Sequence, residues 1–191
     1  MVAASTIAEA AERRWEHLLV EGALRHWLLG ANAFFFLYTA LPLAAPMLVA
    51  AGLVMPGRAI FAVYSLACHQ LPQRSYFIFG EQVGLCQRDV AIYGSIFLSG
   101  LAFAALRNRL RPLPWPVFLA LIAPMAIDGG TQLVGIREST WELRTFTGAL
   151  FGIASVWLTY PHLEAALEPW RRRPEASLAL VGGLTGVGDE S

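Results

Sequence analysis

The sequence of 191 residues contains no lysine, and every one of its fourteen basic residues is an arginine. Charged residues make up only 15% of the chain, and fourteen acidic residues balance the basic ones. Because this balance leaves no polybasic patch, a nucleic-acid partner is not expected. Cysteine is also scarce: two residues are too few for a disulfide scaffold, although they suffice for one bridge in an oxidising compartment.

Apolar residues, by contrast, are abundant. They make up 56% of the chain, and the mean hydropathy of +0.51 is too high for a soluble domain of this size. Four segments with at most one acidic or basic residue are long enough to cross a hydrocarbon core of about 30 Å. These segments are residues 27–55, 90–106, 112–136 and 145–163. We therefore expect an all-α membrane protein with about four transmembrane helices.

A further apolar segment, residues 59–71, is shorter than the ~20 residues that a crossing helix needs, and Pro72 follows it. We predict a short re-entrant helix or half-helix here, which must be buried in protein or line a wet cavity. Residues 1–26 mix apolar and charged residues and are predicted to form an amphipathic helix at the membrane interface. The predicted domains are this interfacial helix, a transmembrane helical domain in residues 27–168, and a flexible C-terminal tail in residues 169–191.

Nine of the arginines form three clusters close to the ends of the long apolar segments. They are Arg13, Arg14, Arg25, Arg107, Arg109, Arg111, Arg171, Arg172 and Arg173. Four crossings place all of them on one side of the membrane, and the positive-inside rule makes that side cytoplasmic. We therefore predict a multi-pass protein of the cell membrane with both termini in the cytoplasm and with residues 56–89 and 137–144 facing outward. If residues 59–79 crossed as a broken fifth helix, only the N-terminus would change sides.

Asp128 is a carboxylate within the third long segment, where a charge costs roughly 2.5–3.5 kcal/mol. Gln132, one helical turn later, shares its face. Because intramembrane carboxylates usually face a bundle interior or a wet cavity, we interpret Asp128 as a candidate general acid or base. The alternative is a structural carboxylate that pairs with Arg144, and we expect these two residues to lie on the same outward-facing cavity.

Arginines from separate segments gather on the outward face in this topology. Arg74, Arg88 and Arg144 could each hold a carboxylate or phosphate bidentately, as an anionic or lipid-linked substrate would require. Gln70 and Gln132 are further candidates for substrate binding. The alternative is internal pairing, in which the arginines only neutralise the acids of the same face. Those acids are Asp89, Asp128, Glu138 and Glu142.

Both cysteines lie in the connection before the second long segment, near a histidine and an aspartate. Cys68 and His69 are adjacent, and Asp89 follows shortly after Cys86. These four side chains could surround one Zn²⁺ ion if the chain between them folds back. The alternatives are a disulfide between Cys68 and Cys86 or two unlinked thiols. We predict that the two cysteines lie close together, and we regard His69 as a second candidate catalytic residue.

Gly148 and Gly152 form a G-x-x-x-G pair in the fourth long segment. Small residues at this spacing usually let two helix backbones approach closely. We therefore expect the pair to pack against another helix rather than to form a ligand site.

Three stretches are specific in combination: "CHQLPQRS", "LCQRDVAIYG" and "APMAIDGGTQLVGIRESTWELRTFTGALFG". Over roughly residues 35–165 the sequence resembles a bacterial and archaeal family of predicted membrane proteins that is catalogued as a domain of unknown function. A cysteine usually stands in that family where this chain has Asp89, so the resemblance implies a three-cysteine, one-histidine metal site or a redox pair. Asp89 could still bind a metal ion, but without a cysteine at this position the chain lacks one thiol of the redox pair. The second half is also similar to the D-x-x-x-Q, R and G-x-x-x-G pattern of VanZ-like membrane proteins, which are associated with glycopeptide resistance.

Three functions fit these residues. The first is an enzyme with a polar site on the extracytoplasmic face, acting on a lipid-linked or anionic substrate, with zinc as the cofactor that the cysteines suggest. The second is a transport or binding protein that uses the same cavity without catalysis. The third is a structural or assembly factor in which the polar residues only hold the bundle together. Complete internal pairing of the charges would favour the third.

Overall fold

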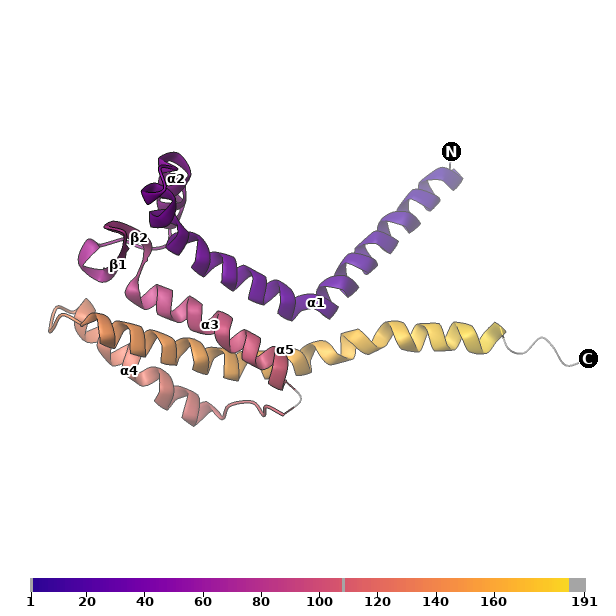
Figure 1. Ribbon diagram of the computed structural model, residues 1–191. Coiled ribbons are helices and arrows are strands. Elements are labelled where there is room, and N and C mark those ends of the chain that lie inside the picture. The colour runs from indigo at the N-terminus through magenta and orange to yellow at the C-terminus, as the bar shows by residue number, and fades with distance from the viewer. Residues whose placement is uncertain (1, 108, 186–191) are drawn as a thin grey trace, which may run out of the picture. The chain divides into compact units, whose positions relative to one another are not determined.

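The computed structural model describes residues 2–107 and 109–185 (Figure 1). The chain divides into two units, one formed by Met1–Gly30 together with His162–Ser191 and the other by Ala31–Pro161. Every residue of the candidate sites described below belongs to the second unit.

Two long helices extend from one unit into the other. Helix α1 spans Val2–Ala50, and its backbone is non-helical at His26, with φ −110° and ψ 15°. The break lies directly before the first long apolar segment, where the sequence predicts the end of an interfacial helix. Helix α5 spans Trp141–Thr185, so the backbone is helical through residues 169–185, which the sequence assigned to a flexible tail. The division into three domains stays a prediction.

The all-α membrane fold is confirmed. Among the described residues, three helical segments are long and apolar enough to cross a membrane: His26–Ala50 of α1, α3 (Gln87–Leu106) and α4 (Trp115–Leu133). A short apolar helix, α2 (Val54–Tyr64), is too short to cross. It begins and ends earlier than the predicted short helix of residues 59–71, whose second half is turn and irregular backbone. The fourth predicted span, residues 145–163, is helical within α5 but is not among the three.

A small β-hairpin, which the sequence did not predict, lies between α2 and α3. A short 3₁₀ helix, η1 (Pro72–Arg74), leads into β1 (Ser75–Ile78), which pairs antiparallel with β2 (Glu81–Cys86). The two-residue loop, Phe79 and Gly80, has positive φ at both positions, 54° and 82°. This is the backbone of the turn that best matches the twist of paired strands. The hairpin brings the end of β2 and the start of α3 back toward the end of α2.

The G-x-x-x-G pair packs α5 against α3, as predicted. A Cβ on Gly148 would lie 2.8 Å from the backbone oxygen of Arg88, and one on Gly152 would lie 2.6 Å from that of Ile92. Farther along, a Cβ on Gly100 of α3 would lie 3.4 Å from the ring of Tyr160. The residues of α5 up to Tyr160 therefore run beside α3 in the same direction and over most of its length (Figure 1).

Candidate functional site

Asp128 lies near the C-terminal end of α4 and is only 1% exposed. Its Oδ2 accepts hydrogen bonds from Arg88 Nη2 at 2.5 Å and from Ser139 Oγ at 2.9 Å. Its Oδ1 accepts one from Arg137 Nη2 at 2.7 Å. Two guanidinium groups and a hydroxyl therefore surround a desolvated carboxylate, and these bonds offset the cost of its burial.

The three donors come from different parts of the chain. Arg88 lies in the first turn of α3, whereas Arg137 and Ser139 lie in the connection between α4 and α5. Gly129 leaves room for the Arg88 guanidinium, since a Cβ there would lie 3.2 Å from Arg88 Nη1. Asp128 thus joins two helices and a loop that are far apart in the sequence.

A second carboxylate, Glu138, lies between two further arginines. Its Oε2 is 3.7 Å from Arg74 Nη2 and 3.7 Å from Arg144 Nη2, and it accepts a hydrogen bond from Gln132 Nε2 at 3.1 Å. Since the Glu138 side chain is 76% exposed, these long ion pairs contribute little to stability. The predicted ion pair of Asp128 with Arg144 is wrong: in the described part of the chain Asp128 pairs with Arg88 and Arg137, and Arg144 pairs with Glu138. Asp128 still lies near enough to Arg144 for its negative charge to favour the charged guanidinium.

Arg144 is buried in the first turn of α5, with 5% of its surface exposed. Its Nη1 donates to the backbone oxygen of Gln73 at 3.3 Å and to Gln87 Oε1 at 3.1 Å. Burial lowers the pKa of Arg144 from its ordinary value, and the positive charges of Arg74 and Arg88 lower it further. Arginine stays protonated near neutral pH, so Arg144 remains a buried positive charge close to two others.

We call Arg74, Arg88, Arg137 and Arg144 the arginine cluster. Among the described residues, two carboxylates, Asp128 and Glu138, form ion pairs with these four arginines, which leaves an excess of two positive charges. The Nε atoms of Arg74, Arg88 and Arg144 are buried, and no hydrogen-bond partner meets them in the described part of the chain. A buried donor without an acceptor costs free energy. The arginine cluster therefore carries positive charge that these ion pairs do not neutralise, and it has N–H donors without an acceptor in the described residues.

Glutamines from the sequence motifs hold the backbone around the hairpin. Gln70 Nε2 donates to the backbone oxygens of Phe61 at 2.7 Å and Gly84 at 2.9 Å. Gln87 Nε2 donates to the backbone oxygen of Ser75 at 3.1 Å. Because both donated bonds of Gln70 go to backbone, its geometry favours a positioning role, and its role in substrate binding stays a prediction.

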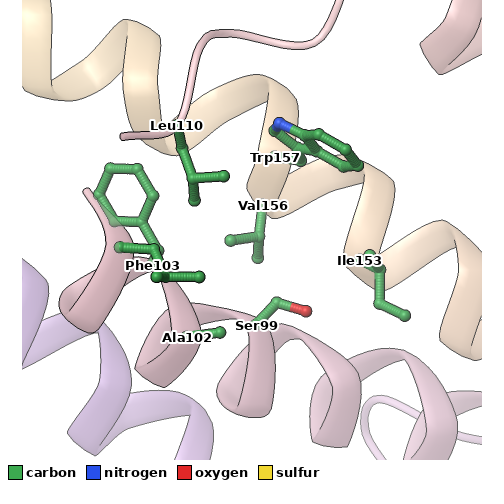
Figure 2. Close-up of a pocket in the computed structure, with 8 residues that line it drawn as sticks. Ser99, Ala102, Phe103, Leu110, Ile153, Val156 and Trp157 are labelled. Atoms are coloured by element: carbon green, nitrogen blue, oxygen red, sulfur yellow. The ribbon is translucent and has the colours of Figure 1, made fainter. Parts of the chain in front are cut away.

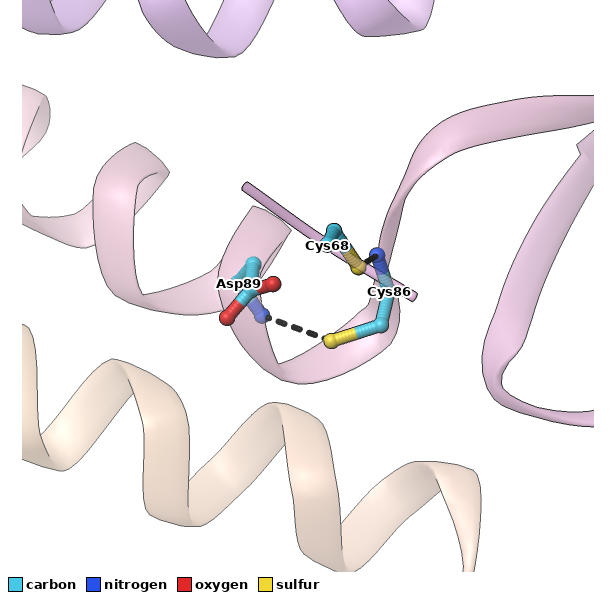
Figure 3. Close-up of side chains that lie close together, drawn as sticks. All are labelled: Cys68, Cys86 and Asp89. Carbon is cyan, nitrogen blue, oxygen red and sulfur yellow. Dashed lines mark hydrogen bonds between the residues drawn. The ribbon is translucent and has the colours of Figure 1, made fainter. Parts of the chain in front are cut away.

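A separate group of side chains lies at the start of α3. Figure 3 shows Cys68, Cys86 and Asp89 close together, and their ligand atoms all lie within 4.8 Å of one another. The predicted closeness of the two cysteines is confirmed, and both are free thiols. His69 is exposed and lies outside this group. The structure therefore brings together three of the four side chains that the sequence proposed as metal ligands.

Hydrogen bonds to sulfur distinguish the two thiols. The backbone N–H of Cys86 donates to Cys68 Sγ at 3.3 Å, and that of Asp89 donates to Cys86 Sγ at 3.5 Å. A hydrogen bond from the Cys86 thiol lowers the pKa of Cys68 to about 7, and the same contact raises the pKa of Cys86. Cys68 is thus the thiol that ionises more readily.

Comparisons with known proteins find a family model and two archaeal relatives. The model of a family described as "Predicted membrane protein (DUF2085)" matches residues 68–158. An uncharacterized protein of Methanocaldococcus jannaschii is 43% identical over 105 residues, which are 53% of this chain and 67% of that protein. An uncharacterized protein of Methanothermobacter thermautotrophicus is 35% identical over 92 residues, 48% of this chain and 83% of that protein. The chain belongs to the DUF2085 family. No solved structure matches it significantly.

The part of the chain that matches the DUF2085 model contains both candidate sites. It begins at Cys68 and includes the hairpin, α3, α4 and the connection to α5. The arginine cluster, both carboxylates that pair with it, and the group of Cys68, Cys86 and Asp89 all lie within it. The resemblance to this family stated from the sequence is therefore confirmed, and the similarity to VanZ-like proteins stays a prediction.

The sequence did not single out all of the residues around Asp128. Arg88 and Gln132 were candidates, and the structure places them together: Arg88 Nη2 lies 3.5 Å from Gln132 Oε1. Arg137 and Ser139 were not candidates, although their hydrogen bonds reach Asp128 directly. The signal that could have found them is their place in a short connection that begins one turn after Asp128.

An apolar cavity of about 180 Å³ lies between α3 and α5 at some distance along both helices from the arginine cluster. Figure 2 shows that its lining includes Phe103, Val156 and Trp157, with the Ser99 hydroxyl as a polar group. None of the described residues that line it is charged. Because ligand sites need a few polar groups to fix orientation, we assign this cavity no functional role.

Proposed function

We propose that this membrane protein binds an anionic group, the phosphate or carboxylate of a small molecule or lipid headgroup, on its arginine cluster. The observation that carries the proposal is the excess of two positive charges over the ion-pair partners of four arginines. Guanidinium groups bind phosphate and carboxylate through paired hydrogen bonds. Three Nε donors of the cluster are buried without an acceptor in the described residues, and an anion that entered the cluster could satisfy them. Glu138, an exposed carboxylate 3.7 Å from two of the arginines, occupies the place that a stronger anionic ligand would take.

The arginine cluster then lies on the extracytoplasmic face. The arginines at residues 107–111, between α3 and α4, belong on the cytoplasmic side by the positive-inside rule. The opposite ends of these two helices carry Arg88 and Asp128. The close course of α5 along α3 supports a fourth crossing, which makes the protein multi-pass and returns the C-terminus to the cytoplasm.

A binding role has stronger support than acid–base catalysis at Asp128. A general base needs a free lone pair that the substrate can reach, whereas the Asp128 carboxylate is 1% exposed and already accepts bonds from Arg88, Arg137 and Ser139. We propose that Asp128 holds two arginines in position. The catalytic roles of Asp128 and His69 stay predictions from the sequence.

Isothermal titration of inorganic phosphate into the protein in a neutral detergent tests the proposal. The unmodified protein is expected to bind phosphate, and Arg74→Gln or Arg144→Gln is expected to weaken binding roughly ten- to hundredfold, the effect of losing one charge-assisted hydrogen bond. Arg58→Gln is the matched control because Arg58 is an exposed arginine of the same predicted face that lies outside the cluster. Melting temperatures show whether each variant is folded. Because Arg74 is more exposed than Arg144, replacing Arg74 disturbs the fold less.

Two outcomes would contradict this function. One is that the unmodified protein does not bind phosphate, and the other is that Arg74→Gln binds as tightly as Arg58→Gln. Reconstitution into phosphatidylcholine vesicles with and without phosphatidic acid separates the two sources of the anion. Competition between the lipid and inorganic phosphate identifies a headgroup ligand, whereas unchanged phosphate binding identifies a soluble one.

A further inference from the structure

Three potential metal ligands converge outside the arginine cluster. Cys68 lies in the segment after α2, Cys86 ends β2, and Asp89 lies in the first turn of α3. Their ligand atoms are all within 4.8 Å of one another, and Figure 3 shows the three side chains around one small volume. The hairpin produces this convergence, because it returns the chain from the end of α2 to the start of α3.

The donor set selects the kind of ion. Two thiolates and one carboxylate suit a borderline-soft divalent cation such as Zn²⁺ and suit Mg²⁺ or Ca²⁺ poorly. With Zn–S bonds of about 2.3 Å, two sulfurs of a tetrahedral site lie about 3.8 Å apart. Since the largest separation here is 4.8 Å at most, closing on the ion requires a shift of only about 1 Å, within side-chain rotation.

The surroundings support a bound cation in a second way. The backbone N–H groups of Cys86 and Asp89 donate to the two sulfurs, as the outer partners of metal ligands commonly do. Tyr64 and Leu85 are buried and pack against Cys68, so the site is shielded from water on that side. Two thiolates and a carboxylate carry one negative charge more than Zn²⁺ neutralises, and the N-terminal end of α3, capped by Cys86, offsets part of it.

We propose that Cys68, Cys86 and Asp89 bind one Zn²⁺ ion with three protein ligands and a fourth position open to water or a ligand. Structural zinc sites are closed by four protein ligands, whereas an open position is typical of reactive zinc. His69, which the sequence offered as the fourth ligand, is exposed and outside the group. The open fourth position distinguishes this site from a structural zinc site with four protein ligands. The proposed zinc site does not depend on anion binding by the arginine cluster.

Elemental analysis of the full-length protein, purified in detergent and dialysed against Zn²⁺ and then against metal-free buffer, tests the site. One zinc ion per chain is expected to remain. Cys68→Ser and Cys86→Ser are expected to lose it, as is Asp89→Asn, which keeps the size of the side chain. His69→Ala and Glu81→Gln, an exposed acid of the same hairpin, are expected to retain it. Melting temperatures of the metal-free proteins show that each variant is folded.

Cobalt substitution tests the open position. Thiolate-to-cobalt charge-transfer bands should appear in the unmodified protein and in His69→Ala, and the d–d bands should change when an added thiol or imidazole binds the ion. Zinc loss in His69→Ala would overturn the three-ligand site, as would zinc retention in Cys68→Ser. Two results would overturn the metal proposal altogether. One is that the protein has two free thiols but holds no zinc, and the other is a chain mass lower by two hydrogens, which reveals a disulfide.

Discussion

Arg88 Nη2 lies 2.5 Å from Asp128 Oδ2, and this contact joins the first turn of α3 to the last turns of α4. Burying either charge without the other would cost free energy, because both side chains are largely removed from water. Together with Arg137 they form a charged centre in which one carboxylate holds two arginines in position. This centre explains why the chain places a carboxylate in an apolar helix.

Replacing Asp128 with Asn removes the charge but nearly preserves the size of the side chain. Arg88 would then be buried without an ionised partner, so we expect the variant to lose about 3–5 kcal/mol of unfolding free energy, the usual effect of breaking a buried pair. The measurement is the melting temperature or the denaturant midpoint in detergent. Glu142→Gln, which changes an exposed acid next to the same connection, should melt like the unmodified protein. A stable Asp128→Asn variant would show that the pair is not structural and would revive the catalytic hypothesis.

Gly152→Ala tests the packing of α5 against α3. The added Cβ would lie 2.6 Å from the backbone oxygen of Ile92 and 2.1 Å from Ser95 Oγ, so the helices must separate. We expect a loss of about 1–3 kcal/mol in detergent, typical of an overpacked contact. Gly130→Ala is the control, because a Cβ at Gly130 meets nothing within 4 Å. If both variants melted alike, the close approach of the two helices would be wrong.

Cysteine labelling in intact cells tests the topology. Thr140 lies in the exposed part of the connection before α5, and Arg109 lies in the connection between α3 and α4. An impermeant maleimide is expected to label Thr140→Cys in intact cells and Arg109→Cys only after permeabilisation, because the arginines near residue 109 belong on the cytoplasmic side. The parent protein gives the background from its two native thiols. The reverse labelling pattern would place the arginine cluster in the cytoplasm.

The length of the uncharged segments was enough to predict most of the helices and the membrane class. The burial of Asp128 also followed from the sequence, because a carboxylate in an apolar helix must avoid lipid. The closeness of Cys68 and Cys86 followed from the need of a short helix to return the chain to the next span. These predictions depend on the length and polarity of each segment and on the distance that a connection can span, which can be read directly from the sequence.

The β-hairpin and the partners of Asp128 depend on features that the sequence does not display as clearly. Both strands are short, and their residues do not alternate cleanly between apolar and polar, so only Gly80 indicates the turn. Asp128 pairs with Arg88 rather than Arg144 because of how α3, α4 and α5 are rotated about their axes, and it pairs with Arg137 because of the path of the connection between α4 and α5. The exposure of His69 depends on the path of the segment after α2, where Gln70 has a left-handed backbone with φ 49°.

The most direct test of the proposed function is the phosphate affinity of Glu138→Gln. Glu138 is the internal anion closest to Arg74 and Arg144, at 3.7 Å from each, and glutamine keeps an acceptor for Gln132 while removing the competing charge. An ion pair to an exposed carboxylate is worth up to about 1 kcal/mol, so we expect Glu138→Gln to bind inorganic phosphate roughly two- to tenfold more tightly than the unmodified protein. If this variant keeps its melting temperature but binds phosphate with unchanged or lower affinity, the proposal that the arginine cluster binds an external anion is contradicted.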